Sequence, residues 1–160
     1  PVESIKVMSN ISSSLVTDEI SKYKIFNKHT SSLASGKAIS VLCSLLPITK
    51  IVAITMSGHA ARIISSQMLS QPIIAVSNDK KVSRSLNLLS GTKGIFYDTK
   101  FYKDNLNHIP KCLFHLWKNK EILESDMILV TALGYPGSGH RMNLIQTHSV
   151  KDLKKLFSWK

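Results

Sequence analysis

Two short segments combine hydroxyl groups, glycines and histidines in an order that suits the binding of a phosphate group. In ITMSGHAARIIS, residues 54–65, an apolar run ends at Thr55, is interrupted at Ser57 and Gly58, and resumes as a helical pattern at His59. Hydroxyls and unhindered amides at the start of a helix can hold an anion. Thr and Ser are also ordinary N-cap residues, and Gly is common where a strand ends. The same residues therefore predict either a phosphate site or a plain helix cap.

The second segment is GYPGSGHR, residues 134–141, which follows another apolar run. Its candidate ligand-binding residues are Gly137, Ser138, Gly139 and His140. The alternative is a flexible connection in which Pro136 and Gly137 form a turn. Because both segments follow predicted strands, they are expected at the same end of a sheet, where they would face one ligand.

Residues for covalent or metal-assisted chemistry are scattered along the chain. No Ser-His-Asp order, HExxH motif, Walker loop or GxGxxG in the required context is present, and the ten acidic residues form no pair suited to metal-bound phosphate chemistry. Cys43 and Cys112 lie among apolar residues without CxxC spacing, which predicts reduced core thiols. The sequence therefore predicts no catalytic residue, no metal site and no cofactor in this domain.

The formal net charge of +11 raises the question of an anionic partner. The lysines are dispersed over several segments without interleaved aromatic residues, so a solvated basic surface is preferred over a nucleic-acid interface. A nucleic-acid binder remains as an alternative, which would lose affinity steeply with salt. No apolar stretch approaches the roughly 20 residues needed to cross a bilayer. We expect no membrane partner, no nucleic acid, and a small phosphorylated ligand.

Apolar periodicity predicts alternating helices and strands within one compact domain. Continuous apolar strands separated by helices indicate a parallel sheet covered on both faces, and the last strand alternates as an edge or antiparallel strand would. The fold class is α/β: a three-layer α/β/α sandwich with a mostly parallel five-stranded sheet. Helices are expected over 2–16, 34–46, 58–69, 80–90 and from near Pro110 to 120, and strands over 50–55, 71–78, 94–98, 126–134 and 141–150.

Four segments in this order resemble the C-terminal domain of pyruvate kinase. They are PVESIKVM, KIVAITMSGHAARIIS, QPIIAVSNDKKVSRSLNLLSGTKGIFYD and SDMILVTALGYPGSGHRMN, and the resemblance covers residues 1–150. It implies a domain for allosteric control and subunit assembly. Phosphoryl transfer from phosphoenolpyruvate to ADP, with Mg²⁺ and K⁺, would belong to a separate barrel domain, so this stretch alone is expected to be inactive.

The resemblance also implies where an effector would bind. The turn that matches Thr55 to Ala60 holds an effector phosphate in members regulated by sugar bisphosphates, and the PGSGH loop would close over the ligand. Ala60 stands where those members carry a hydroxyl. Phe101 and His108 stand on the side of the second phosphate, in place of a tryptophan and an arginine. A histidine lacks the permanent bidentate clamp of an arginine, which favours a monophosphate.

The remaining expectations concern assembly, location and the chain end. By the resemblance, the strand Arg141 to Val150 forms a subunit contact of a homo-oligomer, a tetramer in the parent, with the catalytic barrel of the same parent chain as a further partner. The cytoplasm is the expected compartment, with an organellar parent as the alternative. Residues 151–160 form an extension expected to be a short helix that packs Leu153, Leu156 and Phe157 on the domain. The start at Pro1 suggests an excerpt or a processed product, and a free-standing phosphate-binding module is the alternative function.

Overall fold

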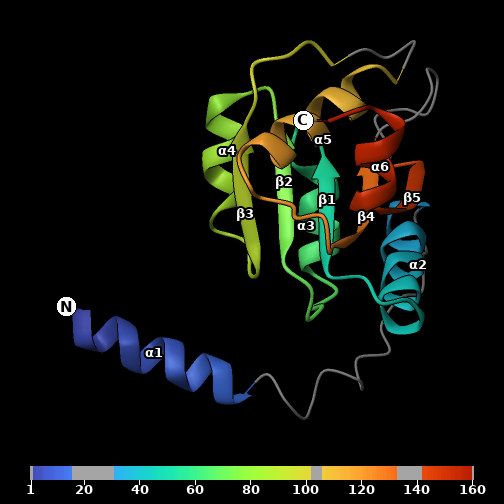
Figure 1. The fold of residues 1–160 in the computed structure, drawn as a ribbon. Helices are drawn as coiled ribbons and strands as arrows, with labels where there is room; N and C mark the ends of the chain where they lie inside the picture. The colour runs from blue at the N-terminus through green and yellow to red at the C-terminus, as the bar shows by residue number, and fades with distance from the viewer. Residues whose placement is uncertain (1, 16–30, 102–105, 133–141, 160) are drawn as a thin grey trace.

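The computed structural model of the chain describes residues 2–15, 31–101, 106–132 and 142–159. Its centre is one five-stranded sheet with the strand order β3-β2-β1-β4-β5 (Figure 1). The first four strands run parallel, and β5 is antiparallel to β4 at the sheet edge. The predicted mixed sheet with its antiparallel last strand is therefore confirmed. The strands are β1 Lys50–Ile54, β2 Ile73–Ser77, β3 Thr92–Phe96, β4 Met127–Ala132 and β5 Leu144–Ser149.

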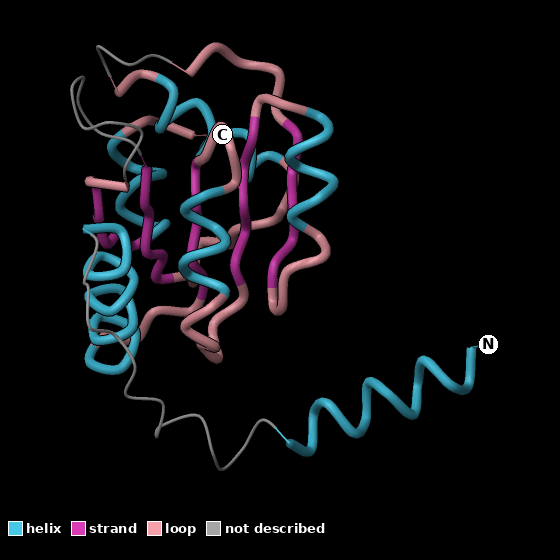
Figure 2. The backbone as a smooth tube through the Cα atoms, turned by 180° about the vertical axis from the view of Figure 1, so that it is seen from behind, coloured by secondary structure: helices cyan, strands magenta, loops and turns pink. Residues whose placement is uncertain are grey.

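Helices cover both faces of the sheet, as the three-layer prediction requires (Figures 1 and 2). One face carries α2, α3 and α4, and the other carries α5 and α6. The first helix, α1, lies apart from the sheet in both views, and neither core cluster includes any α1 residue whose side chain the structure describes. The helices are α1 Val2–Leu15, α2 Ser31–Leu45, α3 His59–Ser65, α4 Lys80–Leu86, α5 His108–Lys118 and α6 Val150–Leu156.

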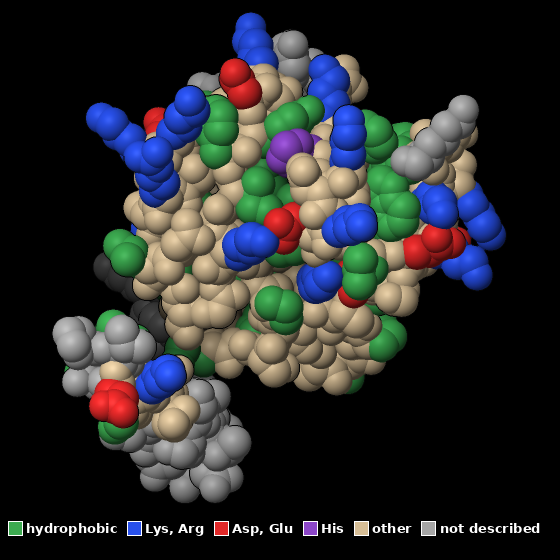
Figure 3. Space-filling view, turned by 60° about the vertical axis from the view of Figure 1, so that its left-hand side comes forward, with side chains coloured by type: hydrophobic (Ala, Val, Ile, Leu, Met, Phe, Trp, Pro, Cys, Tyr) green, Lys and Arg blue, Asp and Glu red, His purple; other side chains and the backbone are tan. Residues whose placement is uncertain are grey.

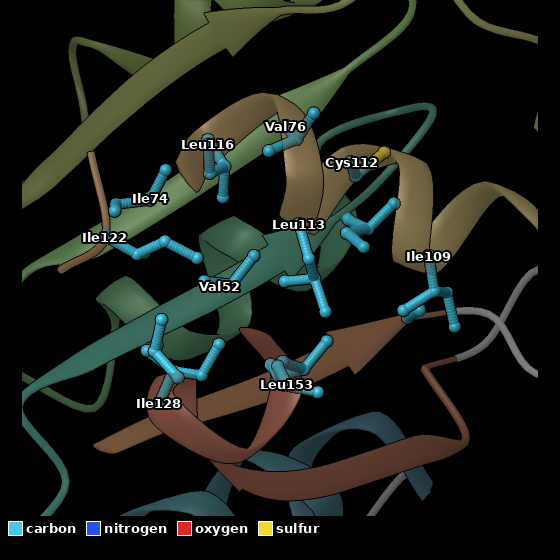
Figure 4. Close-up of a cluster of buried hydrophobic side chains, with 14 of the residues drawn as sticks. Val52, Ile74, Val76, Ile109, Cys112, Leu113, Leu116, Ile122, Ile128 and Leu153 are labelled. Carbon is cyan, nitrogen blue, oxygen red and sulfur yellow. The ribbon is translucent and has the colours of Figure 1, made fainter. Parts of the chain in front are cut away.

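Alternation along the central strands divides the core into two clusters. Val52 and Ile54 of β1 point into the cluster beneath α5 and α6, whereas Ile51 and Ala53 point toward α2, α3 and α4. Figure 4 shows the first cluster, in which Leu113 and Leu116 of α5 lie over the strand side chains. Since both faces are covered, β1 and β2 are apolar almost throughout, which is why they appear as continuous apolar runs in the sequence.

Several predicted boundaries differ from the structure. Helix α5 begins at His108 rather than near Pro110, because a proline is tolerated anywhere in the first turn, where its missing N–H has no intrahelical acceptor. Helix α3 ends at Ser65 and does not reach residue 69, since Met68 follows in a left-handed conformation with φ of 51°.

The C-terminal residues pack differently from the expectation. Val150 and Leu153 of α6 are buried, but Leu156 is 74 % exposed and Phe157 is 44 % exposed, so the predicted packing of these two residues is wrong. Trp159 takes their place, because Ser158 has a φ of 51° and turns the chain back after the helix. The Trp159 ring lies against α5, 6.1 Å from the ring of Trp117 and 6.0 Å from that of Phe114.

Candidate functional site

The candidate site is the turn at the carboxyl end of β1, the central strand. Parallel strands β2 and β4 flank β1, so this turn lies at the end of the sheet where α/β proteins bind ligands. Thr55 is buried directly after the strand, Ser57 is exposed, and α3 begins at His59. Gly58 has a φ of 79°, a left-handed conformation that residues with a Cβ rarely adopt. A glycine is therefore required for the chain to turn here.

A hydrogen bond inside the turn decides which groups are open to a ligand. The Gly58 N–H donates to the Thr55 hydroxyl oxygen at 3.0 Å, so this amide is already satisfied. The Thr55 hydroxyl proton remains to donate elsewhere, and the exposed Ser57 hydroxyl can do the same. Of the donors expected from the sequence, the Gly58 amide is thus occupied by its own turn.

Arg62 is part of this turn, and the sequence reading did not include it. Its Nη1 donates to the Ser57 carbonyl at 2.9 Å. The same nitrogen lies 3.2 Å from the position that a Cβ on Gly58 would take. Side chains of a helix point toward its N-terminus, so a residue one turn into α3 can reach back to the preceding loop. The position of an arginine one turn after the start of a predicted helix is the signal that could have identified Arg62 from the sequence.

His59 joins the turn to the neighbouring helix. Its Nε2 lies 3.2 Å from the hydroxyl oxygen of Ser32 in the first turn of α2. Another serine of α2, Ser35, donates to the carbonyl oxygen of Met142, the first described residue before β5. The starts of α2 and α3 and the entry to β5 therefore meet near the carboxyl ends of β1 and β4.

The two residues expected on the second-phosphate side are buried. Phe101 is 9 % exposed and His108 is 3 % exposed, and their rings stack with centroids 5.2 Å apart. Phe101 belongs to the core cluster beneath α5 and α6, whereas the residues that follow the turn, Ala60 and Ala61, belong to the other cluster. These two rings therefore belong to the packing around α5, and neither presents a positive charge to solvent.

The glycine-rich loop lies outside the described residues. Gly137, Ser138, Gly139 and His140 fall within 133–141, so the structure describes one half of the expected site, from Thr55 to His59 with Arg62 added. Within the described ranges, no three His, Cys, Asp or Glu side chains are close enough together to hold a metal ion. None of the helices described is both long and apolar enough to cross a bilayer.

Both cysteines are buried thiols with raised pKa values. Burial raises the pKa of Cys112 to about 12 and also raises the pKa of Cys43. The thiolate is the nucleophilic form, so at neutral pH neither residue is prepared for covalent chemistry.

Known proteins resemble this chain in sequence. The model of the family described as pyruvate kinase, alpha/beta domain, matches residues 36–148. Curated relatives include pyruvate kinases from Bacillus licheniformis and Sporosarcina psychrophila, each 28 % identical over 96 % of this chain. The matched region is 26 % and 27 % of those proteins, so the chain spans about a quarter of their length.

The fold is also found among solved structures. A crystal structure of a pyruvate kinase from Cryptosporidium parvum superimposes with a TM-score of 0.60 at 21 % identity. The match covers 78 % of this chain and 24 % of that one. The family match runs from the middle of α2 through nearly all of β5, so it includes the whole sheet except Ser149. This chain therefore belongs to the pyruvate kinase alpha/beta domain family.

Proposed function

We propose that this chain is the regulatory and assembly domain of a pyruvate kinase. The observation that carries the proposal is the family match over nearly the entire sheet, in a chain that spans only about a quarter of the length of its pyruvate kinase relatives. The parent enzyme transfers phosphoryl from phosphoenolpyruvate to ADP in its barrel domain, with Mg²⁺ and K⁺ bound there. That barrel is a partner of this domain, and the parent acts in the cytoplasm.

The regulatory part of the proposal is a phosphate site at the turn after β1. The hydroxyls of Thr55 and Ser57 donate to one phosphate group, and the Arg62 guanidinium, held at 2.9 Å from the Ser57 carbonyl, supplies positive charge beside it. Gly58 gives the turn its left-handed backbone, with a φ of 79°. The buried Phe101 and His108 add no exposed charge, which supports a monophosphate as ligand.

Calorimetry with sugar monophosphates, sugar bisphosphates and AMP tests this site. We expect modest binding of a monophosphate and at least about tenfold weaker binding to a Ser57→Ala, Gly58→Asp double variant, since a hydroxyl is lost and a carboxylate is introduced. Arg62→Ala is expected to weaken binding, because it removes the positive charge beside the phosphate. The same chain, given phosphoenolpyruvate, ADP and Mg²⁺, is expected to form no pyruvate above the buffer rate.

The outcomes separate the two functions under consideration. Pyruvate formation by this chain would disprove its role as a non-catalytic domain. Unchanged binding by the double variant would leave the turn as a helix cap only. The alternative, a free-standing phosphate-binding module, predicts the same binding but no barrel-sized segment encoded upstream of Pro1.

The assembly part of the proposal concerns the edge strand β5. At the opposite edge, the Gly94 N–H of β3 donates to the Asn87 side chain at 2.9 Å, which occupies an outward-facing group of that strand. On β5, the Val150 N–H bonds the Asp126 carbonyl, so the antiparallel alternation directs the Thr147 N–H away from β4. An edge with outward N–H groups is a template for pairing with a second copy.

A Thr147→Pro variant is expected to shift self-association toward the monomer, because proline removes an outward N–H without removing a bond to β4. Sedimentation velocity measures the shift, and circular dichroism is expected to show unchanged helix content. Gln146→Pro is the matched control: its N–H faces β4, so the fold itself should be destabilised. Association of the Thr147 variant equal to that of the parent sequence would exclude this edge.

A further inference from the structure

An aromatic groove lies between α5 and the residues that follow α6. Its volume is about 500 Å³. The groove is lined by Pro110, Lys111, Phe114, Phe157, Ser158 and Trp159. The last three of these residues come after residue 148, where the family match ends. The groove therefore depends on a segment outside the matched part of the family.

The ring of Trp159 is buried beneath the groove, and two exposed phenyl rings lie beside it. Trp159 is 7 % exposed, and its ring lies 6.0 Å from that of Phe114 and 5.9 Å from that of Phe157. The Trp159 N–H bonds the Lys154 carbonyl at 3.0 Å, after the left-handed Ser158, which holds the indole against α5. Phe114 and Phe157 remain 41 % and 44 % exposed. Exposed aromatic rings around a well-packed hollow are typical of sites that anchor a partner protein.

Lysines accompany the aromatic lining along the outward side of α5. Lys111, Phe114 and Lys118 are exposed and follow one another at spacings of three and four residues, so they lie on one side of the helix. Leu113 and Leu116 point into the core from the other side (Figure 4). Among the residues that the structure describes, neither Lys111 nor Lys118 forms an ion pair with a carboxylate. A partner lying along this side of α5 would meet two unpaired ammonium groups.

The exposure of the lining decides which kind of ligand fits. A small molecule in its site is usually buried over most of its surface. This groove instead opens to solvent over both phenyl rings. A peptide suits such a groove better, because it can bury one apolar side chain between the rings while its backbone and charged side chains stay at the rim.

We propose that this groove binds an acidic peptide segment of a partner protein. One aromatic or leucine side chain of the peptide lies between Phe114 and Phe157, above the Trp159 ring. Carboxylates of the peptide pair with Lys111 and Lys118 at the rim, where opposite charges guide association and select the partner. The proposal does not depend on the phosphate site at the turn after β1, since the two sites share no residue.

The two tryptophans of the chain make a direct test possible. They are Trp117 and Trp159, whose rings lie 6.1 Å apart beside the groove, so the tryptophan emission of the chain reports on its occupancy. The acidic probe is an acetylated and amidated hexapeptide of two glutamates, phenylalanine, leucine and two glutamates. We expect it to shift the emission saturably, and less at high ionic strength. A polar probe with serine in place of phenylalanine and leucine, and a basic probe with lysine in place of glutamate, are expected to cause no shift.

The variants have to separate the local charge from the charge of the whole molecule. Lys and Arg side chains outnumber Asp and Glu side chains on the face shown in Figure 3, and the net charge is +11. Lys111→Glu should weaken binding of the acidic probe by about tenfold or more, while Tm stays unchanged because the first turn of a helix accepts a glutamate. Lys81→Glu is the matched control: it changes the net charge equally on α4, across the sheet from α5, and binding should not change.

The remaining outcomes would overturn the proposal. Equal affinity of the Lys111→Glu variant and the parent sequence for the acidic probe would do so, as would the absence of any emission shift with that probe. Vesicles of phosphatidylserine and phosphatidylcholine that shift the emission, where the acidic probe does not, would assign the groove to a membrane surface. Emission that changes with protein concentration alone would assign it to a second copy of the chain.

Discussion

Replacing Gly94 with alanine is expected to lower the free energy of unfolding by about 3 kcal/mol or more, and can prevent folding altogether. A Cβ at this position would lie 1.9 Å from the Ser83 carbonyl oxygen and 3.1 Å from the Leu86 Cβ. The obstructing oxygen belongs to the backbone of α4, so no side-chain rotation can relieve the contact. Helix α4 would have to move away from β3, and with it the buried Leu86 side chain.

Chemical denaturation monitored by circular dichroism measures this loss. Gly91→Ala is the matched control, because Gly91 has a φ of 63° but no atom within 4 Å of its added Cβ. Its cost should be about 1 kcal/mol, from backbone strain alone. A Gly94→Ala variant no less stable than the Gly91 control would mean that α4 is not seated on β3 as the structure has it.

Gly94 also illustrates which parts of the fold could be predicted from the sequence. The buried strands β1 and β2 were located within about two residues, because burial on both faces leaves continuous apolar runs. The strand containing Gly94 was expected over 94–98 and is found at Thr92–Phe96. It lies at a sheet edge, where Thr92 is half-buried and Lys93 is exposed, so its apolar pattern does not mark its start. The close approach of α4 at Gly94 depends on tertiary packing that no local pattern reports.

The candidate site was predictable to a similar, partial extent. Thr55 to His59 stand out because a strand pattern stops and a helical pattern starts around a glycine. Arg62 was missed because its side chain acts one helical turn away from its position in the sequence. Phe101 and His108 were named from the resemblance, and their stacking inside the core follows from the packing of α5, which sequence counting cannot show.

The second large effect is expected at Asp126, which joins the starts of β1 and β4. Its carboxylate accepts hydrogen bonds from Lys50 Nζ at 2.8 Å, the Leu123 N–H at 2.7 Å and the Thr49 hydroxyl at 2.9 Å. Burial raises the pKa of Asp126, but the hydrogen bonds from Lys50, Leu123 and Thr49 together outweigh it, so the pKa lies below its ordinary value. The ionised carboxylate is thus favoured by the folded state.

Asp126→Asn is expected to destabilise the chain by about 2–3 kcal/mol at pH 7, because Lys50, whose side chain is only 22 % exposed, loses its carboxylate. A lowered pKa in the folded state means that this stabilisation is present above the unfolded pKa of about 3.9 and is lost as pH falls through the folded value. Urea unfolding at pH 7 and at pH 3 should therefore show a large difference in the free energy of unfolding between the parent sequence and the variant at pH 7, and a smaller difference at pH 3.

Glu124→Gln, which removes a solvent-exposed carboxylate paired with Lys154, is the control and should change stability little at either pH. Equal stability of the Asp126 variant and the parent sequence at pH 7, or a deficit of the same size at pH 3, would show that the charge of Asp126 does not stabilise the junction of β1 and β4.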